Sequence, residues 1–342
     1  MGDITIRELS RSEYAMFLET IPHSAFHRLA WLDAVARTYT LRIRLLGYAR
    51  DSRLCAVTPL MGRRMGPLML WGSPLRKCGT PPATPFCSPV EEASVALPAF
   101  RQWARKQGFS YLQITIPEEP ELQAAAAERI EQLDNLELDL DRSLESIWRD
   151  LAQQKSAVRK AVRSGVHIHF RTTPDFLRIQ DNLLTATYER QKLQPNFPRS
   201  LYRTVLETRK QNGLRLLSAV HQGKTIASIW TFADASRCYY WDAASLPEAR
   251  DLNANHLLVW SLIRWAHRKG LHTLDFVGTS VGGRGGSRPG IGRFKQSMGG
   301  RPLQYRILYR FSPLTRAAFF GYRWLNRLRL GLTGRNHHAS SS

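Results

Sequence analysis

Leu271-His-Thr-Leu-Asp-Phe-Val277 is a mostly apolar segment that lies between a long helical pattern and a run of glycines. A helical pattern over 253–269 ends at Gly270, and a glycine stop followed by an apolar run predicts a helix and then a short buried strand. The next segment, 279–292, holds six glycines and two arginines. We therefore expect a strand whose far end opens into a glycine-rich loop.

Alternating segments lie upstream of this stretch. The segments 214–222, 225–233 and 238–244 alternate along the chain and are joined by short turns, and 303–309 is a last strand. Further helices are expected at 24–38, 98–108, 143–164, 175–192 and 200–212, and further strands at 41–48, 54–60, 111–116, 136–140 and 166–171. This order predicts an α/β fold with a mixed sheet and helices on both faces.

Pro117-Glu-Glu-Pro120 interrupts the pattern near the middle of the chain. A length of 342 residues is enough for two ordinary domains. We predict an N-terminal domain at 1–135, a C-terminal domain at 136–311 and a tail at 312–342. The tail is basic and aromatic, so it is expected either to dock on the body as a helix or to lie on an anionic membrane surface.

Charge is the strongest global signal in the composition. The chain has a formal net charge of +21, from 49 basic and 28 acidic residues, and 43% of its residues are hydrophobic. The hydrophobic content excludes a disordered chain. The charge excess indicates a polyanionic partner such as RNA, a nucleotide-linked substrate or an anionic membrane face. A bias toward arginine codons is the alternative explanation.

The cysteines point away from metal and disulfide chemistry. Cys55, Cys78, Cys87 and Cys238 form no Cys-x-x-Cys pair, and the histidines show no ligand spacing beside them, so no metal site is expected. Buried reduced thiols favour the cytoplasm. No apolar run approaches about 18 residues, so no membrane span is expected. The N-terminal residues lack a charged segment followed by an apolar one, so no secretory leader is expected.

The glycine-rich segment is a candidate anion site. Backbone amides can approach an anion closely where there is no Cβ, and neighbouring cations hold it there. A mobile surface connection is the alternative. The residues expected to hold phosphate are Arg284, Gly285, Gly286, Arg288, Gly290, Gly292 and Arg293.

Two acidic residues lie in predicted strands. A carboxylate inside an apolar strand is costly unless it is paired, so Asp275 is either a general base or the partner of a nearby arginine. Asp242 has the same two interpretations. Alternation places Tyr240 on the face opposite Tyr239 and Trp241, where it either fills the core or lines an acceptor groove.

A predicted basic helix offers a second cation pair. Lys155 and Arg159 are four residues apart and therefore share one side of the helix. They are candidates for contact with a nucleotide diphosphate or with the tRNA backbone. A solvated helix face is the alternative.

Four motifs together resemble the FemAB superfamily. They are Tyr239-Tyr-Trp-Asp-Ala-Ala-Ser245, Asn255-His-Leu-Leu-Val-Trp-Ser-Leu-Ile-Arg-Trp-Ala266, Leu274-Asp-Phe276 and Gly292-Arg-Phe-Lys295. The resemblance implies two tandem GNAT-like domains, each a mixed sheet flanked by helices. It also implies the activity of peptidoglycan aminoacyltransferases or of the related CelD-type acetyltransferases.

The resemblance also implies roles for Phe294 and Lys295. In this superfamily a Phe-Lys pair lies where the donor's terminal phosphate meets the reacting carbonyl, so Lys295 is expected to stabilise a developing oxyanion. The chain has no room for the coiled-coil arm of some members and is similar to the compact ones. The usual acetyl-CoA loop, Arg/Gln-x-x-Gly-x-Gly/Ala, is absent in regular form, because Arg288-Pro-Gly-Ile-Gly292 is one residue short.

These observations lead to one predicted activity and one alternative. The predicted enzyme moves an acyl or aminoacyl group to an amine, with acyl-CoA or aminoacyl-tRNA as co-substrate and no permanently bound cofactor. The amine-bearing acceptor, for which a peptidoglycan precursor is a candidate, implies bacterial cell-envelope or polysaccharide biosynthesis, in the cytoplasm or peripherally on the inner membrane face. The alternative is a noncatalytic RNA- or anionic-membrane-binding protein.

Overall fold

The computed structural model of the chain describes residues 4–65, 68–81, 90–117, 129–152, 154–171, 176–191, 195–278, 289–313 and 315–317. The first half contains β1 (Ile4–Glu8), α1 (Arg11–Glu19), a 3-10 turn η1 (Ala25–His27), α2 (Leu29–Tyr39), β2 (Arg42–Arg50), β3 (Arg53–Met65), β4 (Leu68–Ser73), α3 (Val90–Lys106) and β5 (Tyr111–Pro117). From the middle of the chain onward lie β6 (Arg129–Asp139), α5 (Leu144–Asp150), α6 (Gln154–Arg163), β7 (His167–Arg171), α7 (Phe176–Gln191), α8 (Arg199–Glu207) and α9 (Arg209–Asn212). The last elements are β8 (Leu214–His221), β9 (Lys224–Ala233), β10 (Arg237–Ser245), α10 (Glu248–Asp251), α11 (Ala254–Arg268), β11 (Thr273–Asp275), α12 (Pro289–Ser297) and β12 (Arg301–Phe311).

The described strands form one mixed sheet. Its order is β1-β2-β3-β4-β5-β12-β6-β11-β10-β9-β8-β7. The pairs β4–β5 and β10–β11 are parallel, and the other pairs are antiparallel. The predicted α/β class, with a mixed sheet flanked by helices, is therefore confirmed.

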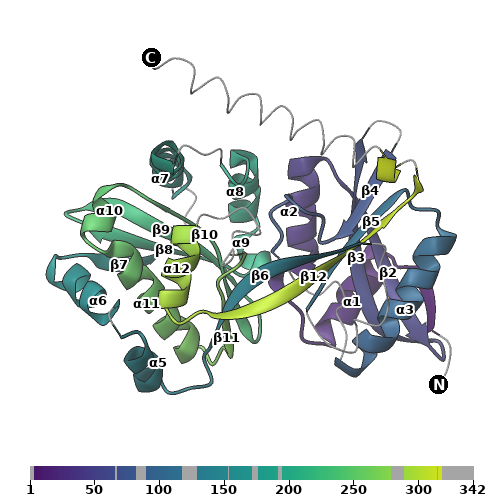
Figure 1. Cartoon of the computed structure of the whole chain (residues 1–342), viewed down its shortest axis with the longest axis horizontal. Helices are drawn as coiled ribbons and strands as arrows, with labels where there is room; N and C mark the ends of the chain where they lie inside the picture. Colours follow the sequence, from purple (N-terminus) through teal and green to yellow (C-terminus); the bar gives the residue numbers. More distant parts are fainter. Residues whose placement is uncertain are drawn as a thin grey trace, which may run out of the picture.

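Two long strands join the halves of the molecule. β12 pairs with β5 along 305–311 and with β6 along 301–309, and β6 also pairs with β11. Figure 1 shows β6 and β12 running from the half that carries α5, α6 and α11 into the half that carries α3. The predicted boundary between 135 and 136 falls inside β6, and the division into two domains remains a prediction.

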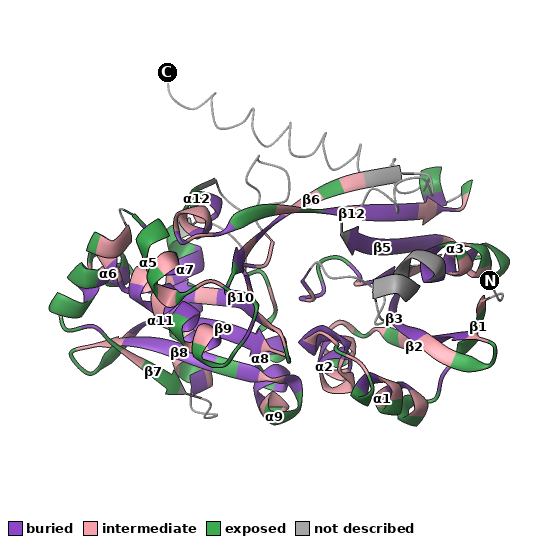
Figure 2. Ribbon diagram, turned by 90° about the horizontal axis from the view of Figure 1, so that it is seen from below, coloured by how far each residue is buried: buried purple, intermediate pink, exposed green. Residues whose placement is uncertain are grey.

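Alternation along the strands directs side chains to separate cores. In β2, Leu45 packs into one cluster while Leu46 and Tyr48 pack into another, on the opposite face under α3. In β10, Tyr239 joins the same cluster as Leu45, whereas Tyr240 joins a third cluster with α6 and α11. Successive side chains of a strand point to opposite faces, so each half of the sheet is covered on both sides. Figure 2 shows the exposed residues concentrated on the outer faces of the helices and on loops.

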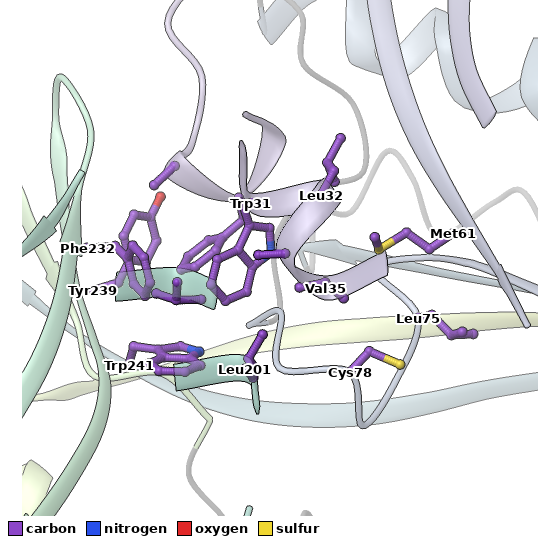
Figure 3. Packing of buried hydrophobic residues seen from close by; sticks show 14 of the residues in the cluster. Trp31, Leu32, Val35, Met61, Leu75, Cys78, Leu201, Phe232, Tyr239 and Trp241 are labelled. Carbon is purple, nitrogen blue, oxygen red and sulfur yellow. The ribbon is translucent and has the colours of Figure 1, made fainter. Parts of the chain in front are cut away.

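The first of these clusters spans both halves of the molecule (Figure 3). The rings of Trp31, from α2, and Trp241, from β10, lie 5.7 Å apart, edge to face. The Trp241 Nε1–H donates to the carbonyl of Gly79 over 2.8 Å, and the Trp31 Nε1–H donates to Thr80 Oγ1 over 3.0 Å. The two halves therefore share one continuous aromatic core.

The structure differs from the predicted elements at several places. The elements β1, α1 and β4 were not expected. The helix predicted over 143–164 is divided into α5 and α6, and Ala152 between them has a left-handed backbone with φ of 42°. The helix predicted over 200–212 is likewise divided into α8 and α9. The glycine-rich loop predicted to run to Gly292 ends earlier, because α12 begins at Pro289. Proline is favoured at the first position of a helix, where its missing N–H needs no partner.

Candidate active site

The pairing between β10 and β11 is short. The two parallel strands pair only from Arg237 with Thr273 to Tyr239 with Asp275. Beyond that point β10 continues to Ser245, and its register against β9 shifts by a bulge between Tyr240 and Asp242. A bulge inserts one residue and redirects the side chains beside it. The end of the β10–β11 pairing and the bulge therefore both lie at the carboxyl end of the paired segment.

A tight turn follows β11 at this end. Asp275 is 1% exposed, and its Oδ1 accepts the Val277 N–H over 2.7 Å. Val277 and Gly278 both have left-handed backbones, with φ of 50° and 49°. Such a conformation is uncommon for a β-branched residue. The segment 275–278 is therefore a strained turn.

Lys295 reaches this turn from α12. Its side chain is buried, and Nζ donates to the carbonyls of Phe276, over 2.5 Å, and Val277, over 2.9 Å. Nζ also lies 5.3 Å from the centroid of the Tyr240 ring. Gly292, Lys295 and Met298 are all buried, and a spacing of three places them on the inward face of α12.

Burial shifts the protonation of Lys295 and of two nearby acids toward neutrality. Burial lowers the pKa of Lys295 to about 8, against the opposing charges of Asp275 and Asp242. Burial raises the pKa of Asp242 to about 6, although its carboxylate accepts a 2.6 Å hydrogen bond from the Tyr202 hydroxyl. Burial and the nearby Glu137 raise the pKa of Asp275 to about 7. Perturbed groups gathered at one place are typical of functional sites.

Four of the predicted site residues are thus brought together: Lys295, Asp275, Asp242 and Tyr240. Asp275 forms one hydrogen bond with an asparagine side chain and one with the backbone, and both interpretations of its role, as a general base and as a paired structural residue, remain predictions. Its hydrogen-bond partners are Asn135 Nδ2, at 2.9 Å, and the Val277 amide, whereas Arg237 forms its ion pair with Glu137.

The neighbouring Phe294 lies on the same helix as Lys295. It is half-buried, and its ring meets the His256 ring edge to face, with centroids 5.1 Å apart. Phe294 therefore joins α12 to α11 rather than contacting the turn through any described bond. Its predicted role at the reacting carbonyl remains a prediction.

The predicted phosphate-binding residues are only partly described. Arg284, Gly285, Gly286 and Arg288 lie outside the described residues. Gly290 is exposed and Gly292 buried, both in the first turns of α12. Arg293 is exposed and two positions from Lys295, so the two cations point to different sides of α12. Anion binding by this segment remains a prediction.

The second predicted cation pair lies on a different surface. Lys155 and Arg159 are on α6, and the Arg159 guanidinium lies over the Trp148 ring at 5.8 Å. The Trp148 ring in turn lies 4.6 Å from that of Trp260 on α11. A cation over an indole is a modest attraction at an exposed site. The described contacts of Arg159 therefore join α6 to α5, away from the turn at 275–278.

Two other residues of the site were not predicted from the sequence. Asn135 and Tyr202 hold Asp275 and Asp242 respectively, through hydrogen bonds of 2.9 Å and 2.6 Å. Asn135 stands in β6, whose sequence Arg-Ile-Glu-Gln-Leu-Asp-Asn-Leu-Glu-Leu-Asp is mostly polar, so nothing in its local sequence marks it. Tyr202 lies on α8, about 40 residues before its partner, and nothing in its local sequence marks it.

Among the described residues, no group of three or more His, Cys, Asp or Glu side chains is placed to hold a metal ion. The described helices include none that is both long and apolar enough to cross a membrane.

Comparison with known proteins places the site within a recognisable domain. Residues 148–295 match the family profile of the acetyltransferase (GNAT) domain. The match includes Asp242, Asp275 and Lys295, and leaves Asn135 just outside. No curated protein matches the sequence.

Solved structures with a similar fold cover almost the whole chain. FemX has a TM-score of 0.70 at 14% identity, over 88% of this chain and 96% of its own. The C-terminal domain of a putative lysylphosphatidylglycerol synthetase from Agrobacterium fabrum has a TM-score of 0.61 at 13% identity, over 91% and 96%. A tandem GNAT protein from the clavulanic acid biosynthesis pathway has a TM-score of 0.50 at 14% identity, over 90% and 98%. The fold is therefore that of tandem GNAT and FemX proteins.

Proposed function

We propose that this protein moves an acyl or aminoacyl group from a phosphate-bearing carrier to an amine, because residues 148–295 match the acetyltransferase (GNAT) profile and the fold is similar to that of FemX. The observation that carries the proposal is the buried Lys295, held by two backbone carbonyls beside Asp242 and Asp275 at the ends of β10 and β11. Burying an ammonium costs free energy, and the contacts that it makes in return add little to stability. Its retention at strand ends favours a chemical role.

Lys295 acts on the carbonyl oxygen of the donor. The ammonium has three N–H groups, of which two donate to Phe276 and Val277, so one remains for a reacting oxygen. When the acceptor nitrogen attacks the carbonyl carbon, negative charge develops on that oxygen. A fixed donor in a water-poor site stabilises this charge more than water does.

Asp242 accepts the proton that the acceptor must lose. An ammonium has no lone pair, so the acceptor nitrogen becomes nucleophilic only after deprotonation. A carboxylate whose pKa is raised to about 6 is still ionised at neutral pH. Its pKa also lies closer to the working pH than that of an ordinary aspartate, which makes it a better proton acceptor. The new bond joins nitrogen to the carbonyl carbon, and the bond from that carbon to the carrier's sulfur or ribose oxygen breaks. The attacking nitrogen loses its second proton as the amide forms, and the leaving atom takes up that proton.

Two donors fit the proposal. The acetyltransferase profile favours acyl-CoA, and the resemblance to the FemAB superfamily, together with a fold similar to that of FemX, makes aminoacyl-tRNA the second candidate. Both carriers are polyanions, which agrees with the net charge of +21. We assign the acceptor to the amine-bearing precursors of the cell envelope, with a peptidoglycan precursor as the first to test. The reaction then belongs in the cytoplasm, and the tail beyond 312 is a candidate contact with the anionic inner face of the membrane.

A transfer assay with both donors tests the proposal. The purified protein is incubated with radiolabelled acetyl-CoA, or with radiolabelled aminoacyl-tRNA with and without ribonuclease, together with a lysine-containing stem peptide and an amino sugar. Use of acyl-CoA releases free thiol and is insensitive to ribonuclease, whereas ribonuclease abolishes transfer from tRNA. The variant Lys295→Met is expected to lose transfer, and Lys269→Met, at an exposed position on the end of α11, is its matched control.

Binding without chemistry is the outcome that overturns the proposal. If RNA or anionic vesicles bind the protein tightly, no donor is consumed, and Lys295→Met binds as the wild type does, the protein is a noncatalytic binding protein. Mass spectrometry of ligands that copurify with the protein separates nucleotide, CoA and RNA independently of any acceptor.

A further inference from the structure

Asn135 is a buried amide directly beneath the proposed transfer site. It lies in β6 and is 0% exposed. Its Nδ2 donates to Asp275 Oδ1 over 2.9 Å, and its Oδ1 accepts the N–H of Gly278 over 3.0 Å. One side chain therefore ties the first and the last residue of the turn 275–278 to each other. Both bonds link positions about 140 residues apart in the sequence.

The turn needs such a tie because its own sequence does not favour its conformation. Val277 is β-branched and has φ of 50°, which crowds its Cβ against the backbone. A strained residue persists only where its surroundings determine its conformation. Besides the Asn135 side chain, the described bonds of this turn are those from the Lys295 ammonium to the Phe276 and Val277 carbonyls, from the Val277 amide to the Asp275 carboxylate, and from the Phe276 amide to the Leu136 carbonyl.

The same turn sets the position of Lys295. The two carbonyls that accept from Nζ belong to Phe276 and Val277, and the direction of a carbonyl follows the backbone dihedrals on either side of it. If Val277 relaxed to an ordinary conformation, its carbonyl would rotate away from the ammonium. The ammonium position thus depends on the conformation that Asn135 holds.

We propose that Asn135 is a positioning residue for acyl transfer, because it holds the turn whose carbonyls fix the Lys295 ammonium at the ends of β10 and β11. This inference rests on the proposed function for its catalytic meaning. The claim that Asn135 sets the position of the Lys295 ammonium does not depend on which donor is used. Asn135 does not itself touch the reacting atoms in this account.

Several charged and titratable groups face the turn, and one of them, Tyr305, also has Asn135 as a hydrogen-bond partner. They come from β6, β10, β12 and α12, and they are Glu137, Arg237, Cys238, Tyr239, Asp242, Lys295 and Tyr305. The bond from Asn135 lowers the pKa of Asp275. Its loss leaves Asp275 more often neutral and removes part of the opposing charge near Lys295. Both this change and the rotated carbonyls lower the pKa of Lys295.

The test measures Lys295 directly. Protein labelled with ¹³Cε-lysine is titrated by NMR, with the Lys295 signal assigned from Lys295→Arg. In Asn135→Ala the midpoint of Lys295 is expected to fall by about half to one pH unit, the effect of about one lost hydrogen bond. The Gly278 amide, having lost its acceptor, is expected to exchange with deuterium faster.

Asn212→Ala is the matched control. Asn212 is also a 0% exposed asparagine, and it makes the same kind of bonds, from Nδ2 to the Val205 carbonyl and from the Leu214 amide to Oδ1. Because it lies between α9 and β8, its loss is expected to destabilise the fold without moving the titration of Lys295. If Asn135→Ala and Asn212→Ala leave the Lys295 midpoint equally unchanged, the positioning role is overturned.

Asn135→Asp keeps the test decisive should the alanine variant not fold. The aspartate retains the size of asparagine and an acceptor oxygen for Gly278, and it adds a carboxylate near Asp275. The Lys295 midpoint is then expected to rise, opposite to the effect of alanine, because the two carboxyl groups keep at least one full negative charge beside Lys295 throughout its titration, whereas Asp275 alone, with a pKa of about 7, is partly protonated there. A midpoint that stays at the wild-type value overturns the proposal.

Kinetics separate this proposal from the proposed function. With the donor found by the transfer assay, Asn135→Ala is expected to reduce kcat by about tenfold or more while KM for the donor changes little, as expected when alignment rather than binding is lost. If the wild type transfers from no donor, the proposed function fails, yet the titration still decides whether Asn135 controls Lys295. If the wild type is active and Asn135→Ala raises only KM, the positioning role fails and the proposed function stands.

Discussion

Replacing Lys295 by methionine tests whether this residue is kept for chemistry or for stability. Burial lowers the pKa of Lys295 from 10.5 to about 8, so the charged form is less favourable in the folded than in the unfolded chain. Each pKa unit corresponds to about 1.4 kcal/mol, which makes this cost about 3 kcal/mol below pH 8. Between the two pKa values the unfolded chain holds a proton that the folded chain has released, so wild-type stability rises with pH there.

Lys295→Met removes this titration while keeping a side chain of similar length. The variant also leaves two carbonyls without their donor, a loss that does not depend on pH in this range. We therefore expect the free energy of unfolding of the wild type to rise by about 3 kcal/mol relative to the variant between pH 7 and pH 10.5. At the same time kcat for acyl transfer is expected to fall by about 10²–10³-fold, the cost of one lost oxyanion donor.

Urea denaturation at several pH values measures the first quantity. Lys269→Met serves as the control, because an exposed lysine is expected to show no such pH-dependent difference. The reasoning is refuted if the wild type and Lys295→Met keep a constant difference from pH 7 to pH 10.5. A variant that is less stable than the wild type by several kcal/mol at pH 7, with unchanged transfer, makes Lys295 a structural residue.

Three further predictions concern the site, a close backbone approach and the shared core. Burial raises the pKa of Asp242 from 3.8 to about 6, so its ionisation destabilises the folded state as pH rises through this window. Asp242→Asn is therefore expected to stabilise the protein at pH 7 by up to about 3 kcal/mol and to abolish an acidic limb near pH 6 in the pH profile of kcat/KM. An unchanged pH–rate profile contradicts its role as proton acceptor. Gly213 and Gly223 have nearly equal φ of 75° and 76°, but only at Gly213 would an added Cβ lie 2.4 Å from a carbonyl oxygen. In urea denaturation, Gly213→Ala is therefore expected to lower the free energy of unfolding by about 1–3 kcal/mol more than Gly223→Ala. Equal losses in the two variants contradict the close approach. Trp241→Phe leaves the Gly79 carbonyl without its donor and is expected to lower the free energy of unfolding by about 1–3 kcal/mol. The variant is still expected to unfold in one transition, and two separate transitions contradict a core shared by both halves.

The strands around the site could be predicted because their signals are local. The alternation over 214–244 and the helix that ends before Gly270 follow from side-chain periodicity and a glycine stop, and the structure confirms β8, β9, β10, α11 and β11. The helix α12 was missed because proline and two glycines in its first turn have low helix propensity. In the structure this turn begins with proline, and its inward glycine, Gly292, is buried. Packing rather than propensity therefore decides this helix.

The composition of the site was harder to predict than its location. Lys295 and Asp275 were found through the family resemblance and through the cost of a charge in an apolar strand. Asn135 was missed because its burial depends on the position of β6 between β12 and β11, and sheet order is not visible in one sequence. The bulge beside Trp241, which affects where Asp242 lies, is likewise a property of pairing with β9 and not of local sequence.

The most direct test of the account is a single-turnover measurement of acyl transfer by wild-type protein, Lys295→Met and Lys269→Met, with donor binding measured in parallel. The assay follows radiolabel from acetyl-CoA or aminoacyl-tRNA into an amide of the stem peptide or the amino sugar, and into water through slow hydrolysis of the donor. The account predicts product from one class of donor, a rate lower by about 10²–10³-fold in Lys295→Met at nearly unchanged donor affinity, and a wild-type rate in Lys269→Met. Equal rates in all three proteins, or binding of both donors with no turnover of either, would contradict it.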